Sequence, residues 1–241
     1  MKKRMQVNKL SLQIFAMATM LVDHVGEVFF PEIGLMRCIG RLAFPIFAFF
    51  VAEGYIHTHN FWNYVKRMSI FALLAEIPFD LAFFGRLWDA GHQNTMWTFV
   101  LSLLCLYAVD YAKKRCKEQW IWLLCTFAVC LTGYLAGNFF HTDYHGFGVL
   151  TVMIFYLCNQ GIRGRILSTA LLLYVNLFCL GGRMISLGAL TFSRQGLAVL
   201  SLPLLWLYKG EQGPHNKKIQ YFCYGFYPAH LLIIGLIALK G

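Results

Sequence analysis

Residues 10–30, LSLQIFAMATMLVDHVGEVFF, decide what kind of protein this is. An α-helix needs roughly 20 mostly apolar residues to cross the hydrocarbon core of a bilayer, and this stretch has that length. Within it, however, Asp23 and His24 stand side by side. An ionisable side chain at mid-bilayer costs about 2.5–3.5 kcal/mol on insertion scales. The stretch therefore predicts a membrane-spanning helix whose polar pair needs a partner, a water-filled cavity or a function.

The rest of the chain has the same apolar character. Of its 241 residues, 59% are hydrophobic and only 13% are charged, with a mean hydropathy of +0.58. These values are far from those of an ordinary soluble domain. They predict an all-α, polytopic transmembrane helix bundle that forms a single domain over residues 1–241. About nine spans are expected, and eight or ten also fit because the sixth and eighth are short. The candidate spans are residues 10–30, 34–56, 67–84, 94–112, 119–140, 146–160, 165–181, 195–208 and 220–239.

The net charge of +10 is distributed as a membrane topology requires. Most basic residues fall in alternate loops, and the positive-inside rule then places the N-terminus in the cytoplasm and the C-terminus outside. No nucleic-acid partner is needed to explain the charge. The N-terminus also resembles a signal peptide, but its apolar run continues into further spans, which favours a first span. The basic residues assigned to the cytoplasm are Lys2, Lys3, Arg4, Lys9, Lys66, Arg67, Lys113, Lys114, Arg115, Lys117, Arg163, Arg165, Lys209, Lys217 and Lys218.

On this topology the intramembrane polar residues form one layer. His24 and Arg41 both fall in the outer half of their spans, and Glu76 and Asp80, four residues apart, share one helix face near the outer end of theirs. A polar layer at this depth is solvated most simply by a cavity open to the outer face.

Simpler interpretations remain open for several of these charges. Arg37 and Arg41 have stems long enough to snorkel to the outer interface. Glu27 and Asp80 lie near helix ends, and Glu53 lies at the cytoplasmic interface. Asp23 and His24 are harder to explain in this way, because adjacent helical residues point about 100° apart and cannot both avoid lipid. We expect one of the two to reach a basic neighbour such as Arg41 and the other to face the cavity.

The cysteines and the loop 141–145 contain residue types that bind metals or form disulfides. The eight cysteines form no CxxC pair, so neither a disulfide framework nor a zinc knuckle is predicted. In HTDYH, His141 and His145 flank Asp143, but the glycines that follow indicate an irregular segment in which three such close ligands would be strained. We therefore expect no metal, and a polar loop that lines the outer vestibule.

A histidine beside a carboxylate in a partly dry cavity holds or delivers protons near neutral pH. Two classes of function follow from this chemistry. A proton-coupled transporter or exporter would use the pair as a relay, whereas a membrane transferase would use it to deprotonate an acceptor. A third interpretation is that the protein is a non-catalytic assembly factor for a surface appendage.

Six segments together resemble the TraX family, whose founding activity is N-terminal acetylation of a conjugative pilin subunit. They are MLVDHVG (20–26), CIGRLAFPIFAFFVAEGYIHTH (38–59), LLAEIPFDLAFFG (73–85), GHQNTMWTFVLSLL (91–104), DYHGFGVL (143–150) and YGFYPAHLLII (224–234). They cover nearly the whole chain in order. The family is in turn similar to the broader integral membrane acyltransferases, in which a helix-borne histidine early in the chain is the catalytic base.

The resemblance implies roles for individual residues. It implies that His24 is the base, that Asp23 orients it or supports its charged form, and that Arg41 and a helix break at Phe44–Pro45 form the facing wall. Arg41 or an amide such as Asn94 would stabilise the thioester oxyanion. The other matching positions are implied only as site-lining candidates: Glu53, Glu76, Asp80, Gln93, Asn94, Asp143, His145, Gly146, Tyr227, Pro228 and His230.

The resemblance also implies the donor and the location. Acetyl-CoA would supply the acetyl group from the cytoplasm, and cytoplasmic Lys66, Arg67, Arg163 and Arg165 are candidates to bind its phosphates. The acceptor would be an amine or hydroxyl at the outer side, whether on a peptide, a glycan or a small molecule. The protein is expected in the bacterial cytoplasmic membrane, with the lipid bilayer as its surroundings.

Overall fold

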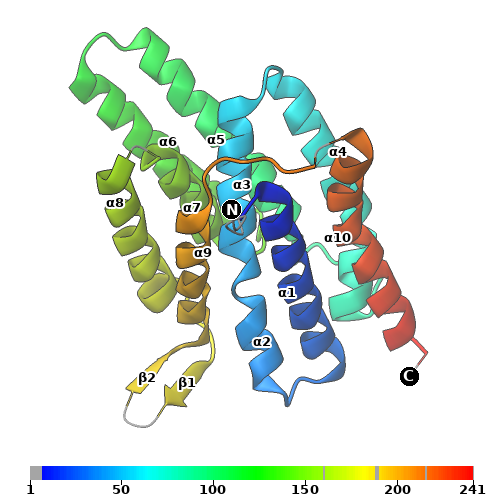
Figure 1. Ribbon diagram of the computed structural model, residues 1–241. Helices are drawn as coiled ribbons and strands as arrows, with labels where there is room; N and C mark the ends of the chain where they lie inside the picture. Colours follow the sequence, from blue (N-terminus) through cyan, green and yellow to red (C-terminus); the bar gives the residue numbers. More distant parts are fainter. Residues whose placement is uncertain (1–6, 160, 188–189, 215, 241) are drawn as a thin grey trace, which may run out of the picture.

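The computed structural model is a bundle of helices that run alternately between two ends of the molecule (Figure 1). It describes residues 7–159, 161–187, 190–214 and 216–240. A π-helical turn, Val175–Cys179, continues α8, and a 3-10 helix, Arg194–Ser201, leads into α9. The α-helices are α1 (Lys9–Phe29), α2 (Gly34–Gly40), α3 (Ala43–His57), α4 (Phe61–Phe84), α5 (Thr95–Arg115), α6 (Gln119–Phe139), α7 (His145–Leu157), α8 (Gly161–Tyr174), α9 (Leu202–Leu207) and α10 (Lys217–Ala238).

Each of the nine expected spans coincides with a helical segment, which confirms the all-α fold class. Within the described part of the chain, six segments are long and apolar enough to cross a membrane: Lys9–Phe29, Gly34–His57, Thr95–Arg115, Gln119–Phe139, Gly161–Cys179 and Lys217–Ala238. Helix α4 is as long but carries more charged residues, and α7 and the segment Arg194–Leu207 are shorter. The chain is thus a multi-pass membrane protein.

One element was not expected from the sequence. Strand β1 (Met184–Leu187) pairs antiparallel with β2 (Leu190–Ser193), with Met184 opposite Ser193. This hairpin projects from the end of the bundle below α8 and α9 (Figure 1). Hydropathy does not reveal it, because a strand of four residues is too short to show a clear alternation.

The two ends of the bundle differ in chemistry. The basic end comprises residues 58–60, 116–118 and 208–214, and it lies beside the basic helix ends that begin α10 and finish α5. The site end comprises residues 30–33, 85–94 and 140–144, and the hairpin projects from it (Figure 1). These two names are used below.

The second expected span is broken, but not where the sequence predicted. Helix α2 ends at Gly40 and α3 begins at Ala43, so the break lies at Arg41–Leu42 rather than at Phe44–Pro45. Pro45 falls in the first turn of α3, where a backbone N–H has no intrahelical partner and proline is tolerated. The break therefore presents Arg41, at the junction of α2 and α3, to the middle of the bundle.

Helices α1 and α2 pack closely because two residues at their contact, Gly26 and Gly40, are glycines without a side chain. A Cβ atom added to Gly26 would lie 2.6 Å from Cβ of Met36, and one added to Gly40 would lie 2.1 Å from Cβ of Asp23. Small residues of this kind let helix backbones approach in membranes. This contact sets the position of Asp23 and His24 relative to the arginines of α2.

Candidate functional site

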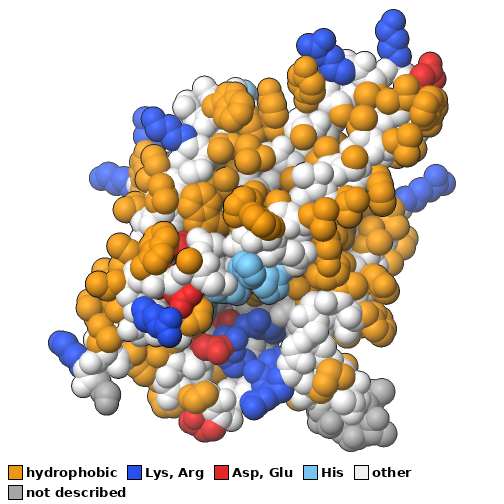
Figure 2. Space-filling model, turned by 180° about the vertical axis from the view of Figure 1, so that it is seen from behind, with side chains coloured by type: hydrophobic (Ala, Val, Ile, Leu, Met, Phe, Trp, Pro, Cys, Tyr) orange, Lys and Arg blue, Asp and Glu red, His pale blue; other side chains and the backbone are white. Residues whose placement is uncertain are grey.

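A single cavity of about 970 Å³ reaches from the basic end to the site end. On α1 it is lined by residues from Lys9 to Glu27, and 18 residues of helix rise about 27 Å. That length approaches the roughly 30 Å thickness of a bilayer's hydrocarbon core. Seen from behind, basic, acidic and histidine side chains gather in one hollow of an otherwise mostly apolar face (Figure 2). The cavity therefore links the two ends, whereas a cavity open only to the outer face was expected.

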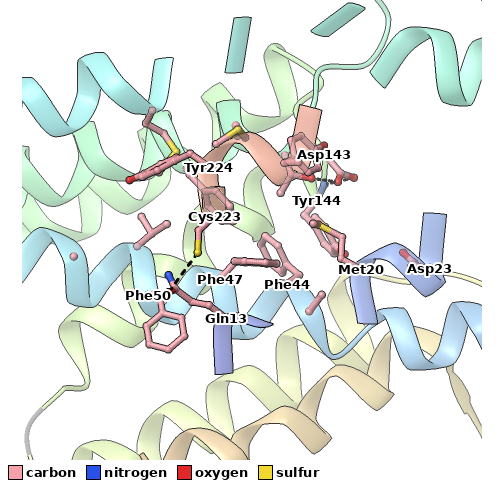
Figure 3. A pocket seen from close by; sticks show the side chains of 18 of the residues that line it. Gln13, Met20, Asp23, Phe44, Phe47, Phe50, Asp143, Tyr144, Cys223 and Tyr224 are labelled. Atoms are coloured by element: carbon pink, nitrogen blue, oxygen red, sulfur yellow. Dashed lines mark hydrogen bonds between the residues drawn. The ribbon is translucent and has the colours of Figure 1, made fainter. Parts of the chain in front are cut away.

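The middle of the cavity is apolar and aromatic. Phe44, Phe47 and Phe50 project into it from α3, and Tyr144 lies beside Phe44 (Figure 3). The Phe44 and Tyr144 rings stack with centroids 3.8 Å apart and an angle of 10° between their planes. Nearer the basic end, the Cys223 thiol lies 4.0 Å from the Gln13 side-chain oxygen. Polar groups are thus concentrated toward the two ends of the cavity.

Asp23 is held by two arginines at the site end. Its Oδ1 lies 2.9 Å from Nη1 of Arg37, and its Oδ2 lies 2.5 Å from Nη2 of Arg41. Arg37 also pairs with Glu27. Two carboxylates and two guanidinium groups therefore balance in a partly buried cluster, as buried charges require. One of Asp23 and His24 was expected to reach a basic neighbour such as Arg41, and the structure shows that it is Asp23; Arg37 is not a snorkelling residue.

His24 has another histidine as its partner. Its Nδ1 lies 2.8 Å from Nε2 of His230, and the two rings are nearly parallel, with 9° between their planes. Nδ1 of His230 in turn lies 2.6 Å from the carbonyl oxygen of Phe226, one turn earlier in α10. His230, rather than Asp23, therefore orients the His24 ring.

These contacts determine where the protons lie. A carbonyl oxygen only accepts, so Nδ1 of His230 carries a hydrogen and Nε2 of a neutral His230 accepts one. His24 must then donate from Nδ1, which leaves its Nε2 with a free lone pair. His24 lines the cavity. It can gain a proton on Nε2 without losing its hydrogen bond to His230, which is what a general base requires.

A second histidine and carboxylate face the same cavity. Nε2 of His92 lies 3.6 Å from Oδ1 of Asp143, and both residues line the cavity. Asp143 also accepts hydrogen bonds from the Thr95 hydroxyl and the Tyr144 backbone N–H. His92 stacks on Phe79 with ring centroids 5.8 Å apart.

The two groups favour each other's charged form. Contact with the Asp143 carboxylate raises the pKa of His92 above its ordinary value of 6.5, although burial acts in the opposite direction. Burial alone would raise the pKa of Asp143, but the nearby His92 and the hydrogen bond from the Thr95 hydroxyl outweigh it and lower that pKa. His92 therefore carries a positive charge to higher pH than a free histidine.

This pair predicts a pH-dependent stability. Because the folded-state pKa of His92 is raised, its stabilising contribution is fully present below about pH 6.5 and is lost as pH rises through the folded value. The unfolding temperature of the wild type minus that of His92→Gln should therefore shrink between about pH 6 and pH 9. Thermal unfolding in detergent measures it, and a difference that stays constant with pH would contradict the pairing.

At the basic end, Arg67 is the basic side chain most available to a ligand. Its guanidinium lies over the rings of Tyr64 and Tyr224, 5.5 Å from each centroid. It lines the cavity, and its buried Nε forms no hydrogen bond with the described residues. Lys9 also lines this end but pairs with Glu53 at 2.8 Å.

The other basic candidates lie elsewhere. Lys66 and Arg163 are exposed, and neither is among the described residues that line the cavity. Arg165 lines a separate crevice of about 360 Å³ beside α8 and α9. Helix geometry explains the contrast between Lys66 and Arg67, because adjacent residues point in different directions.

The structure separates the site-lining candidates into two sets. Asp143 and Tyr227 line the cavity, and His230 lies behind His24. Of the described candidates, the others do not line it: Glu53, Glu76, Asp80, Gln93, Asn94, His145, Gly146 and Pro228. Gln93 contributes through its backbone, which bonds to the loop at His141 and Asp143. Asp80 is fully buried and accepts the Asp89 backbone N–H at 2.7 Å, so it is not an exposed helix-end charge.

Asn94 is structural in this geometry. Its side-chain oxygen caps α5 by accepting the Met96 N–H at 3.0 Å. Its amide nitrogen donates to the Ala72 carbonyl oxygen at 2.9 Å and to Glu76. Both amide hydrogens are therefore used, and the amide cannot also bind an oxyanion.

Sequence reasoning missed three residues that the structure brings into the cavity wall: His92, Thr95 and Tyr144. His92 and Thr95 stand in the GHQNT segment and Tyr144 in DYHG, so the segments were noticed but not these members. The signal available was their position next to polar residues at helix ends. Among the described residues, no three His, Cys, Asp or Glu side chains are grouped to hold a metal ion.

Comparison with known proteins agrees with the segments identified in the sequence. A family model described as TraX protein matches residues 9–238. A probable fimbrial assembly protein FimC, serogroup H1, of Dichelobacter nodosus is 25% identical over 256 residues, covering 97% of each chain. An uncharacterized protein of Rickettsia prowazekii, RP591, is 37% identical over 73 residues, which cover 30% of this chain and 27% of that one. No solved structure matches the chain.

Proposed function

The chain belongs to the TraX family, and from this premise we propose that it is an integral membrane acetyltransferase. It would move an acetyl group from cytoplasmic acetyl-CoA to an amine or hydroxyl acceptor at the outer side of the bacterial cytoplasmic membrane. The basic end is then the cytoplasmic end. The observation that carries this proposal is the cavity that joins Arg67 at one end to His24 at the other.

The residues that line the cavity fit acetyl-CoA as a substrate. Its volume of about 970 Å³ is at the upper end of the range for small-molecule sites, roughly 300–1,000 Å³. Arg67 offers a guanidinium whose Nε has no hydrogen-bond partner among the described residues, and arginine matches phosphate geometry. The apolar middle suits an uncharged arm that passes between the two ends. A thioester carried on such an arm would then reach the polar residues of the site end.

His24 would act as the general base on the acceptor. His24 lines the cavity with Nε2 free to take a proton, and its Nδ1 hydrogen bond to His230 keeps the ring oriented whether His24 is neutral or charged. Asp23 would keep Arg41 in place at the cavity wall rather than orient the base. His92 and Asp143, which line the cavity at the site end, would face the acceptor.

Acetyl-CoA binding tests the proposal. Acetyl-CoA should raise the unfolding temperature of the purified protein, since a ligand at 100 times its Kd stabilises by about 2.7 kcal/mol. Arg67→Gln should weaken this binding about tenfold, because a charged hydrogen bond contributes about 1.5–3 kcal/mol and 1.4 kcal/mol is a factor of ten.

The neighbouring Lys66→Gln is the matched control, since Lys66 is exposed and outside the cavity wall. It should bind acetyl-CoA like the wild type. Unfolding without ligand, measured for both variants, separates lost binding from lost stability. No effect of acetyl-CoA on the wild type would remove the basis of the proposal.

A proton-coupled transporter is the second candidate, because the same cavity reaches both ends and contains His24 and His92. A transporter predicts different results from an acetyltransferase in two assays, acetyl-CoA binding and solute flux. Acetyl-CoA would leave the unfolding temperature unchanged, and vesicles containing the protein would show solute flux driven by a pH gradient.

A further inference from the structure

Tyr144 occupies a constrained position at the site end. It is one of three non-glycine residues with positive φ in the described chain, with φ of 63°, and it directly precedes α7. Such a conformation costs roughly 1–3 kcal/mol and persists where the surroundings over-determine it. Here the Asp143 carboxylate accepts the Tyr144 N–H at 3.1 Å, and the Thr98 hydroxyl donates to the Asp143 carbonyl oxygen at 2.5 Å.

The loop before it is held as firmly. Gln93 donates its N–H to the carbonyl oxygen of His141 and accepts the N–H of Asp143, both at 2.9 Å. The stacking on Phe44 then determines the plane of the Tyr144 ring. The backbone strain therefore serves to place this one aromatic side chain in the cavity wall.

The Tyr144 hydroxyl has no internal partner. The ring lines the cavity, yet its hydroxyl forms no hydrogen bond with the described residues. Burial raises the pKa of Tyr144, so the phenol keeps its hydrogen, and Arg41 is the nearby positive group that acts most strongly on it. A protonated hydroxyl on a half-buried, cavity-lining ring, without a partner among the described residues, is a donor available to an acceptor in the cavity.

Arg41 offers further donors in the wall of the same cavity. A guanidinium has five N–H groups. Three bonds from Arg41 are present, to Arg37 O at 3.2 Å, to Gln195 Oε1 at 3.3 Å and to Asp23 Oδ2. Two N–H groups therefore remain on a side chain that lines the same cavity. Asn94, the other donor expected from the sequence, is excluded because its amide hydrogens are used.

We propose that Tyr144, together with Arg41, binds the carbonyl oxygen of the thioester as negative charge develops on it. This inference rests on the proposed function and adds Tyr144 as a catalytic residue. The acceptor atom forms a bond to the carbonyl carbon and gives its proton to Nε2 of His24, while the carbonyl π pair moves to the oxygen held by Tyr144 and Arg41. When the carbonyl re-forms, the C–S bond breaks, and the sulfur leaves with the electron pair and takes the proton from His24.

The test compares two tyrosine variants. The full-length protein in detergent is given acetyl-CoA with water as acceptor, and thiol release gives kcat and KM. Tyr144→Phe should lower kcat about 10- to 100-fold, somewhat less than the loss of a sole oxyanion donor because Arg41 remains. Its KM and its unfolding temperature should not change, since the hydroxyl has no hydrogen bond to lose.

Tyr156→Phe is the matched control. The Tyr156 hydroxyl donates to Asp110 and lies outside the cavity wall. Its loss should lower the unfolding temperature and leave kcat unchanged. Tyr144→Phe should therefore change kcat and not the unfolding temperature, whereas Tyr156→Phe should change the unfolding temperature and not kcat.

The outcomes distinguish failure of the inference about Tyr144 from failure of the proposed acetyltransferase function. Turnover by the wild type with equal kcat in Tyr144→Phe overturns the inference alone. A raised KM with unchanged kcat in that variant also overturns it, because the hydroxyl would then bind only the ground state. If wild-type turnover is no higher than that of His24→Ala, the proposed function fails and the inference fails with it.

Discussion

Replacing His24 by alanine is expected to lower acetyl-CoA turnover about 10³-fold, within the range of 10²–10⁴ for general acid–base catalysis. The reason is the unshared Nε2 lone pair of His24, a cavity-lining residue, which stays available while Nδ1 is engaged by His230. Without it, the remaining imidazole of the described pair is that of His230, which does not line the cavity. The His230 nitrogens face the Phe226 carbonyl oxygen and the position left by His24.

Turnover, ligand binding and unfolding must be measured together for this variant. Because His24 lies far from Arg67, acetyl-CoA should still raise the unfolding temperature of His24→Ala. His230→Ala should lower kcat less than His24→Ala, since it removes the orienting partner and not the base. His141→Asn serves as the control, because His141 is exposed, lies outside the cavity wall and has φ of 49°, which asparagine tolerates. Full turnover in His24→Ala would exclude the base role.

Replacing Gly40 by alanine is expected to inactivate and destabilise the protein together. The new Cβ would lie 2.1 Å from Cβ and Cγ of Asp23 and 2.2 Å from its Oδ1. These atoms belong to the root of the side chain and cannot swing away, so α1 and α2 must move apart. Overpacking of this kind costs about 1–3 kcal/mol. A shift of about 1 Å at Asp23 also displaces His24, and misplacement on that scale lowers catalysis about 10²-fold.

The matched control is Gly225→Ala. A Cβ added to Gly225, within α10, meets no atom within 4 Å. Alanine should therefore be neutral there or stabilise by up to about 1 kcal/mol through helix propensity. Unfolding and thiol release measured on both variants test the prediction. A Gly40→Ala protein as stable and active as the wild type would show that α1 and α2 do not depend on this contact.

The residues of the site were predictable to different degrees. That one member of the Asp23–His24 pair reaches Arg41 followed from the sequence, because expensive polar groups in the same half of neighbouring spans have few other partners, and the structure shows that this member is Asp23. The roles of Asn94 and Asp80 did not follow. A polar residue near the end of a span caps a helix, holds a loop or faces a cavity, and sequence spacing does not distinguish these. In the structure, Asn94 caps a helix and Asp80 holds a loop.

The basic residues illustrate the same limit. The positive-inside rule concerns the charge of whole loops and therefore treats Lys66, Arg67, Arg163 and Arg165 alike. Only Arg67 among them lines the cavity, because it projects from α4 toward Tyr64 and Tyr224. The direction of a side chain around its helix depends on how that helix is rotated in the bundle, which loop charge does not report.

The sequence by itself determined that this is a multi-pass helical membrane protein and where its helical segments lie. Hydropathy and length are properties of local stretches, so they can be read along the chain. It also located the intramembrane charges, including Asp23 and His24. Only the tertiary structure decided that His24 pairs with His230, 206 residues away, and that one cavity joins the two ends. Such contacts arise from the packing of helices against one another, and no local pattern specifies which faces meet.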